Sequence, residues 1–186
     1  MTSLDERATL LSLDGVGAYD TIARRAMFRG LADLPDGEKL IPFVRLFYDS
    51  PSRYWWEDEL GETRTVHQGE GGEQGDPLMP LLFSLGQHRA LVGVQAHLKT
   101  DERLFAFLDD IYVVCPPERV GEVNLVLEQQ LRVHTGINIH QGKTKLWNAV
   151  GCKPALADTL TAAAQQRIPD AIVWRGIAIC FRPNRD

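Results

Sequence analysis

Three aspartates stand at positions where a carboxylate is costly unless its charge is balanced. Asp109 and Asp110 interrupt the apolar run "RLFAFLDDIYVVC", and Asp14 directly follows the apolar run "TLLSL". Clustered carboxylates raise each other's proton affinity unless a cation lies between them. Their hard oxygen atoms suit Mg²⁺, which prefers one or two carboxylates together with substrate phosphates. Two such ions about 4 Å apart promote in-line attack at phosphorus.

An adjacent pair of aspartates also has a plain structural interpretation. Residues 104–108 and 111–115 have the pattern of a tight hairpin, with Asp109 and Asp110 at or near its turn. Aspartate is common in turns because its side chain hydrogen bonds to the nearby backbone. For the pair alone, this is the better interpretation. The metal-site hypothesis therefore depends on the elements around the pair.

The elements that must position these acids alternate between strands and helices. Patterning predicts a strand at 9–13, a helix at 20–34 capped by Asp20, a helix at 36–49 capped by Asp36, and a hairpin around "ELGE" (59–62). The glycine-rich loop "QGEGGEQGD" (68–76) leads to a helix at 77–98, with Pro77 and Pro80 in its first turn.

After the acidic hairpin, residues 116–136 predict an amphipathic helix that ends at Gly136. Its buried face comprises Val120, Val123, Leu127 and Leu131. Short strands are expected at 137–139 and 143–150, a helix at 154–167, and a last strand pair at 171–174 and 176–179.

The fold class predicted from this order is α+β. A β–α–β–β–α–β core matches the split βαβ (ferredoxin-like) arrangement, an antiparallel sheet with helices on one face. In that arrangement the first strand lies beside the hairpin strands, so Asp14 and Asp109 become neighbours although they are far apart in sequence.

Composition narrows the class of protein. The chain has 186 residues, enough for one domain, and a formal net charge of −5, which argues against tight autonomous binding of nucleic acid. A carboxylate site that meets phosphates through metal ions is still compatible with this charge. No apolar run reaches the roughly 18 residues of a membrane span, and "MTSLDERATL" is not a secretory signal. Three widely spaced cysteines (Cys115, Cys152 and Cys180) form neither a zinc pattern nor a disulfide framework, so we expect an intracellular protein of the cytoplasm or nucleus.

Five segments, in their order, resemble the palm of reverse transcriptases, especially those of non-LTR retrotransposons and group II introns. "LSLDGVGAYD" resembles motif A, "QGDPLMPLLF" motif B, "FLDD" motif C, "GINIHQGKTK" motif D and, more weakly, "VWRG" motif E. Met79 replaces the usual serine of motif B, and Leu108 the usual alanine of motif C. The resemblance covers roughly residues 10–179.

This resemblance implies an RNA-directed DNA polymerase that transfers a nucleotide from a dNTP to a primer 3′-hydroxyl on an RNA or DNA template. Asp14 and Asp109 would hold two Mg²⁺ ions, or Mn²⁺ in their place. Asp110 lies beside them as a third catalytic acid and a softer candidate metal ligand, and the backbone carbonyl of Gly15 is a further candidate metal ligand.

The resemblance also implies nucleotide-binding residues, each with a structural alternative. Tyr19 would lie under the sugar and exclude a 2′-hydroxyl; the alternative is a core aromatic. Gln74 and Gly75 would contact the nucleotide; the alternative is a glycine-rich connection in which Asp76 caps the next helix. Lys143 would approach the triphosphate; the alternative is an exposed strand lysine.

Basic and aromatic residues elsewhere are assigned structural roles. Arg24 and Arg25 are expected on a solvated face and "RYWW" (53–56) in the hairpin core, with nucleic-acid contact as the alternative. The five histidines show no ligand spacing.

We expect residues 1–186 to form a single palm domain with partial fingers at about 36–76, without full fingers or a thumb. Fingers and thumb segments would then be needed in cis or in trans, and processive synthesis by this chain alone is not expected. The alternative is a catalytically incompetent palm remnant that serves as a binding or structural module.

Two other classes share short motifs with this chain. A phosphatase of the haloacid dehalogenase type needs an aspartate two residues before Asp14, where Ser12 stands. In nucleotide cyclases a segment like "GGEQG" lies in a hairpin, whereas here it precedes a helix.

Overall fold

The computed structural model describes residues 8–148. Its strands are β1 (Thr9–Leu13), β2 (Ser52–Glu57), β3 (Thr63–Gln68), β4 (Arg103–Phe107), β5 (Asp110–Cys115) and β6 (Lys145–Asn148). Its α-helices are α1 (Ala18–Thr21), α2 (Arg24–Ala32), α3 (Ile41–Tyr48), α4 (Met79–Gln95) and α5 (Val120–Thr135). Its 3₁₀ helices are η1 (Gly37–Leu40), η2 (Pro117–Arg119) and η3 (Gln141–Lys143).

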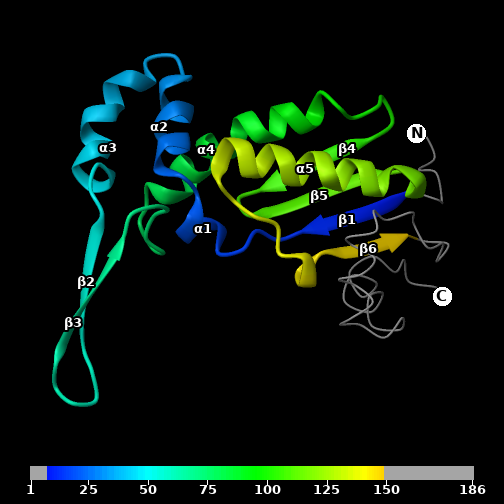
Figure 1. Cartoon of the computed structure of the whole chain (residues 1–186). Coiled ribbons are helices and arrows are strands. Elements are labelled where there is room, and N and C mark those ends of the chain that lie inside the picture. Colours follow the sequence, from blue (N-terminus) through cyan, green and yellow to red (C-terminus); the bar gives the residue numbers. More distant parts are fainter. Residues whose placement is uncertain (1–7, 149–186) are drawn as a thin grey trace, which may run out of the picture.

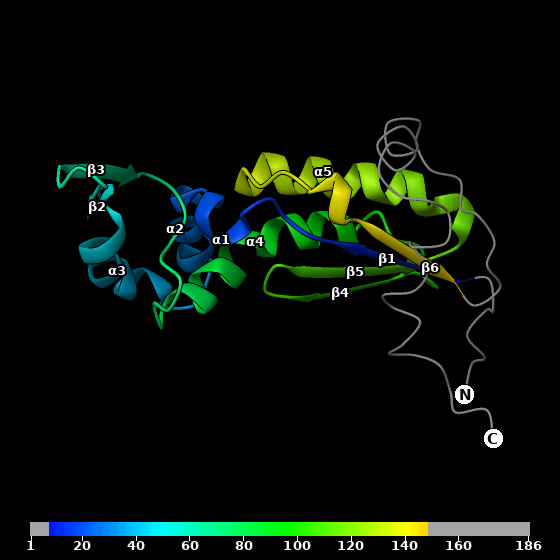
Figure 2. The same cartoon turned by 90° about the horizontal axis from the view of Figure 1, so that it is seen from below.

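A four-stranded antiparallel sheet forms one part of the molecule, in the order β4-β5-β1-β6. Helices α4 and α5 lie together on one of its faces, while α1, α2, α3 and the β2–β3 hairpin extend beyond one end of it (Figures 1 and 2). The strand order is that of the split βαβ arrangement. The predicted α+β class, with an antiparallel sheet and helices on one face, is confirmed for the described residues.

The register of β1 and β5 brings the ends of the two acidic segments together. Leu13 pairs with Ile111, so Asp14 leaves the sheet at the end where the β4–β5 turn lies. Alternate residues of both strands, Leu11, Leu13, Ile111 and Val113, are buried under α4 and α5. The predicted face of α5 is also buried, and Gly136 ends that helix with a φ of 78°.

The predicted helix at 20–34 is interrupted. Residues Ile22 and Ala23 are extended, with ψ values of 129° and 122°, and separate α1 from α2. The amide of Ala23 donates to the carbonyl of Thr135, and the carbonyl of Ile22 accepts from Gly71. These tertiary hydrogen bonds replace helical ones. The predicted cap at Asp20 is wrong, since Asp20 lies inside α1 and makes no capping bond.

The predicted helix at 36–49 starts as η1 and continues as α3. Pro42 falls in the first turn of α3, where its missing N–H breaks no helical hydrogen bond. Within one helix from residue 36 it would have been interior. Asp36 is the N-cap residue of η1, but its side chain makes no capping hydrogen bond; it has a φ of 61° and pairs with Lys39.

The expectation that "RYWW" lies in the hairpin core is wrong, since Tyr54, Trp55 and Trp56 are 38%, 68% and 54% exposed on a hairpin that extends away from the sheet (Figure 1). The remaining expectations have mixed outcomes. Both hairpins form, α4 begins at Met79 and not at 77, and residues 145–148 of the strand expected at 143–150 form β6. Residues 137–139 make only an isolated bridge, Gly15 with Ile139. The elements expected at 154–179, the segment that resembles motif E, Cys152 and Cys180 lie outside the described residues. Between residues 8 and 148, no helix is long and apolar enough to cross a membrane.

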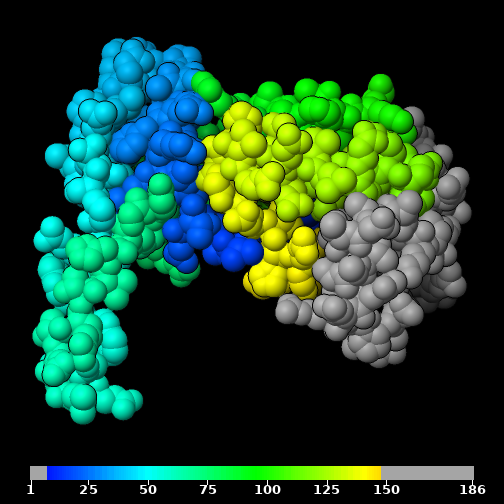
Figure 3. Space-filling view, viewed as in Figure 1, coloured from blue at the N-terminus to red at the C-terminus, as the bar shows by residue number. Residues whose placement is uncertain are grey.

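The β2–β3 hairpin projects from the rest of the molecule (Figure 3), and Arg24 holds its base. Its side chain was expected on a solvated face, but only 5% of the residue is exposed. The guanidinium donates to the Ser52 hydroxyl and to backbone carbonyls at both ends of the hairpin and in the glycine-rich loop, namely Tyr48, Ser50, Gln68 and Gly71. The expectation failed because local charge does not indicate which carbonyls the tertiary fold leaves without partners.

We expect Arg24→Lys to lower the free energy of unfolding by about 2 kcal/mol, because an ammonium cannot reach all the acceptors of the guanidinium fork. The neighbouring Arg25 is exposed, so Arg25→Lys should change it by less than about 0.5 kcal/mol. Urea unfolding followed by circular dichroism compares the two variants. Equal effects would contradict the structural role of Arg24.

Candidate active site

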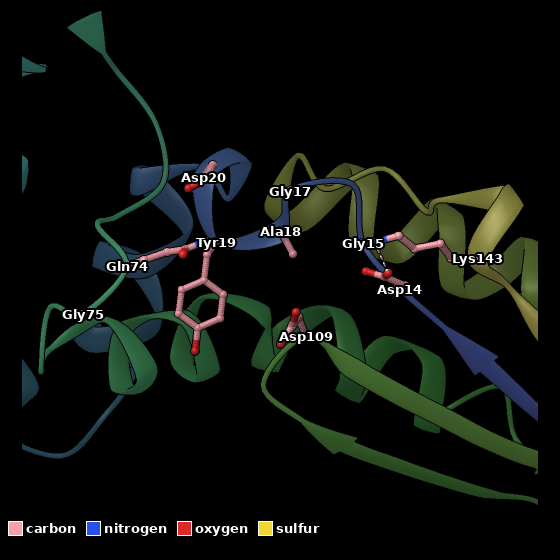
Figure 4. Close-up of a pocket in the computed structure, with 10 residues that line it drawn as sticks. All are labelled: Asp14, Gly15, Gly17, Ala18, Tyr19, Asp20, Gln74, Gly75, Asp109 and Lys143. Atoms are coloured by element: carbon pink, nitrogen blue, oxygen red, sulfur yellow. Dashed lines mark ion pairs between the residues drawn. The ribbon is translucent and has the colours of Figure 1, made fainter. Parts of the chain in front are cut away.

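A pocket of about 400 Å³ opens where β1 ends and the β4–β5 turn begins (Figure 4). All the predicted site residues except Asp110 lie on its wall: Asp14, Gly15, Tyr19, Gln74, Gly75, Asp109 and Lys143. Gly17, Ala18 and Asp20 complete it, and the sequence offered no functional signal for the first two. Residues from four separate segments thus face one cavity.

The chain after β1 is held in place by backbone pairing with residues 138–140. The amide of Val16 donates to Asn138 and the amide of His140 to the carbonyl of Asp14, each at 2.8 Å. Gly15 has no room for a side chain, since a Cβ would lie 2.8 Å from Ile137 Cγ2 and 2.9 Å from Ala18 Cβ. This pairing sets Lys143 beside Asp14.

Asp14 and Lys143 form an ion pair, with 2.8 Å between Oδ2 and Nζ. The side chains are 32% and 60% exposed. Asp14, through a hydrogen bond and its charge, raises the pKa of the Lys143 ammonium, and Asp109 adds to the effect. Two of the three carboxylates on the pocket wall, Asp14 and Asp109, therefore stabilise the charged form of Lys143.

The β4–β5 turn separates the two adjacent acids. Leu108 adopts a φ of 54°, in the left-handed region that is unfavourable for a leucine. Its carbonyl accepts a 2.7 Å hydrogen bond from the Gln87 side chain of α4, which is buried. Asp109 then faces the pocket, whereas Asp110 begins β5 opposite Phe107, exposed and off the pocket wall.

Tyr19 forms a flat wall of the pocket. Its ring stacks on Phe83 of α4, with centroids 4.6 Å apart and planes 11° from parallel. Partial burial raises the pKa of the Tyr19 hydroxyl, and the negative charge of Asp109 raises it further. In Figure 4 the ring stands between Gln74 and Asp109. Tyr19 is thus supported by the core on one side and open to the pocket on the other.

The glycine-rich loop docks directly on α1. The amide of Gly71 donates to Ile22 at 2.8 Å and that of Gly72 to Tyr19 at 3.0 Å. At Gly71, with a φ of 68°, a Cβ would overlap the Tyr19 carbonyl. These two glycines bring Gln74 to the pocket. In the sequence, the repeated glycines before Gln74 indicated a close backbone approach, but not that α1 would be the element approached.

Asp76 acts at the entrance of α4. Its carboxylate accepts a 2.8 Å hydrogen bond from the amide of Leu78 and another from the hydroxyl of Tyr48. Burial and this bond raise the pKa of the Tyr48 hydroxyl. The expectation that Asp76 caps α4 is wrong, because the N-cap residue is Leu78 and it has no side-chain capping bond; Asp76 instead holds the turn before the helix.

The donor set of the pocket suits a divalent cation in part. Across the described ranges, no group of three or more histidine, cysteine, aspartate or glutamate side chains is close enough to hold a metal ion. Asp14 and Asp109 are nevertheless two hard ligands at one cavity, and a positive group, the Lys143 ammonium, already lies on Asp14. Two carboxylates with open space match the way Mg²⁺ binds together with phosphates.

Comparisons with known proteins agree with a polymerase-like fold. No family model matches the chain. It is 28% identical over 145 residues to the Retrotransposable element SLACS 132 kDa protein of Trypanosoma brucei gambiense; the match covers 78% of this chain and 12% of that protein.

Solved telomerases have a similar structure. Apo telomerase from Candida tropicalis matches with a TM-score of 0.60 and 13% identity, over 76% of this chain and 29% of that one. Telomerase from Candida albicans, in complex with the TWJ fragment of telomeric RNA, matches with a TM-score of 0.57 and 14% identity, over 81% and 29%. The described residues therefore have a reverse-transcriptase-like α+β fold, similar to part of these larger proteins.

Proposed function

We propose that the chain is the palm, with partial fingers at about residues 36–76, of an RNA-directed DNA polymerase. The observation that carries the proposal is the pocket itself. Its wall combines three carboxylates, a stacked tyrosine and a glutamine on a glycine-rich loop, and it opens at one end of a reverse-transcriptase-like sheet. The similarity to a retrotransposable element protein supports the same class.

Asp14 and Asp109 would hold Mg²⁺ or Mn²⁺, with the Gly15 carbonyl as a further candidate ligand. When bound, two such ions supply charge stabilisation at phosphorus and lower the pKa of the attacking hydroxyl. Asp110 stands off the pocket wall, so we assign it a supporting role through its charge rather than direct ligation.

The other pocket residues would position the substrates. The Tyr19 ring stacks on Phe83; it would offer a rigid apolar surface to the deoxyribose and exclude a 2′-hydroxyl. The Gln74 amide can donate to and accept from a base, and Gly75 lets the backbone approach closely. A dNTP and a primer on an RNA or DNA template are the proposed partners, with fingers and thumb segments acting in cis or in trans.

One observation favours the alternative of a non-catalytic palm remnant. Lys143 neutralises Asp14, and Asp110 does not face the pocket. Of the three predicted catalytic acids, only Asp109 both lines the pocket and shows no ion pair within the described residues. A palm that no longer binds divalent cations would retain this arrangement as a structural or binding module.

Asp14→Asn and Asp109→Asn are each expected to weaken Mn²⁺ binding roughly tenfold or more, because each removes a charged ligand. Asp101→Asn, a change of equal charge at an exposed turn outside the pocket, should leave the affinity unchanged. Electron paramagnetic resonance of free Mn²⁺ measures this directly. Absence of binding by the wild-type chain, or equal affinity in all variants, would favour the remnant.

Addition of a single nucleotide to a primer on an RNA template then tests the reaction. The proposal predicts Mg²⁺-dependent extension by one or a few nucleotides that both Asp14→Asn and Asp109→Asn abolish. Cation binding without any extension, even when fingers and thumb segments are supplied in trans, would argue for a binding module.

A further inference from the structure

We propose that Lys143 couples cation binding to nucleotide binding. In this inference, which rests on the proposed function, the Lys143 ammonium neutralises Asp14 while the site holds no divalent cation. It then leaves Asp14 for the triphosphate that arrives with the cation. The residue would thus weaken binding of the cation alone and strengthen binding of the cation together with the nucleotide.

The geometry ties the backbone of Lys143 to the site but leaves its side chain free to move. The amide of Lys143 donates to the carbonyl of His140 at 2.9 Å, and His140 donates in turn to the carbonyl of Asp14 at 2.8 Å. The Lys143 side chain is 60% exposed, and its ammonium forms the 2.8 Å ion pair with Asp14. An exposed pair of this kind is weak, so it can exchange partners at little cost.

Charge counting on the pocket wall explains why exchange is favourable. Three carboxylates, Asp14, Asp20 and Asp109, face one ammonium, so the wall is left with an excess of negative charge. A divalent cation at Asp14 and Asp109 competes with the ammonium for the same oxygen atoms. A triphosphate brought in by that cation offers the displaced ammonium new anionic oxygen atoms within the same pocket.

The consequence is cooperativity. Because Lys143 must leave Asp14 before the cation binds, it lowers the affinity for the cation alone. Its new contact with phosphate offsets this loss only when the nucleotide is present. By linkage, the nucleotide must then raise cation affinity by the same factor as the cation raises nucleotide affinity. Removal of the ammonium should reduce this factor.

The experiment measures Mn²⁺ affinity with and without a dNTP for the wild-type chain, Lys143→Met and Lys145→Met. Lys145 lies two residues away on β6, does not line the pocket, and serves as the control for loss of a nearby positive charge. Without nucleotide, Lys143→Met should bind Mn²⁺ about two- to fivefold more tightly. Addition of dNTP should increase the Mn²⁺ affinity of Lys143→Met by a smaller factor than that of the wild type. Lys145→Met should have the Mn²⁺ affinity of the wild type both without and with dNTP.

A second readout is the unfolding temperature. The increase caused by Mn²⁺ alone should be larger for Lys143→Met than for the wild type, because no internal cation competes. Unchanged or weaker Mn²⁺ binding by Lys143→Met, or an equal response of Lys145→Met, overturns the coupling. If the wild type binds Mn²⁺ in an Asp109-dependent way but Lys143→Met is unaltered, only this inference fails; if no variant binds Mn²⁺, the proposed metal site fails with it.

Discussion

Arg119→Met is expected to lower the free energy of unfolding by about 3–5 kcal/mol, because it leaves a buried carboxylate without its partner. Glu102 has a side chain with 0% exposure, and Arg119 Nε lies 2.8 Å from its Oε1. A second guanidinium nitrogen of Arg119 donates to Glu102 at 3.2 Å. The pair joins the segment before β4 to η2, which follows β5. Its loss therefore weakens the β4–β5 hairpin, whose turn carries Asp109.

Arg89→Met is the matched control, because it also removes an arginine that contacts a carboxylate through two nitrogens. Arg89 and Asp33 have side chains that are 46% and 41% exposed, so solvent screens them. We therefore expect a much smaller loss of stability than for Arg119→Met. Denaturant unfolding at neutral pH compares the two variants, and similar losses would contradict the importance of burial at Glu102.

The same pair predicts a pH dependence. The hydrogen bond from Arg119 lowers the pKa of the Glu102 carboxyl below its ordinary value of 4.5. A carboxyl whose pKa is lowered on folding stabilises the fold above its ordinary pKa, and this contribution is lost as the pH falls through the lower, folded value. The stability gap between the wild type and Glu102→Gln should therefore narrow as the pH falls below about 4.5. A constant gap from pH 7 to pH 3 would be evidence against it.

Gly30→Ala is expected to lower the free energy of unfolding by about 3 kcal/mol, near the upper end for overpacking. A Cβ at residue 30 would overlap the backbone carbonyl of Leu85, where α2 crosses α4. Backbone atoms cannot rotate away, so the two helices would have to separate. This loss exceeds the roughly 1 kcal/mol that alanine gains over glycine inside a helix.

Gly93→Ala provides the comparison. Gly93 is also inside a helix, α4, but the obstacle there is the end of the Gln130 side chain, which can adopt another rotamer. We expect Gly93→Ala to be neutral or to stabilise the chain by up to about 1 kcal/mol. Thermal unfolding of both variants tests the difference, and a loss at Gly93 equal to that at Gly30 would show that the two contacts are equivalent.

The sequence alone determined the elements whose patterns are local and strong. Strand β1, both hairpins and α5 have the expected periodicity or turn residues, and each forms close to its predicted bounds. The order of these elements was also sufficient to place Asp14 beside the acidic hairpin, because the split βαβ topology puts β1 next to β5, the second strand of that hairpin. Proximity of the predicted pocket residues follows from this topology, whereas their chemical roles stay predictions.

Only the tertiary structure decided which partner each polar group finds. The break at Ile22 and Ala23 exists because Thr135 and Gly71 offer backbone hydrogen bonds across the fold. Arg24 is buried for the same reason, since carbonyls from three segments converge on it.

The acidic pair "DD" shows the same limit at the candidate site. The motif resemblance ranks Asp109 above Asp110 as a ligand candidate, but it does not indicate where either side chain lies; the turn at Leu108 directs Asp109 into the pocket and leaves Asp110 at the start of β5. Periodicity and composition report which face of an element is apolar. They do not report which distant carbonyl or ammonium will meet a given side chain, because that contact depends on how the elements pack.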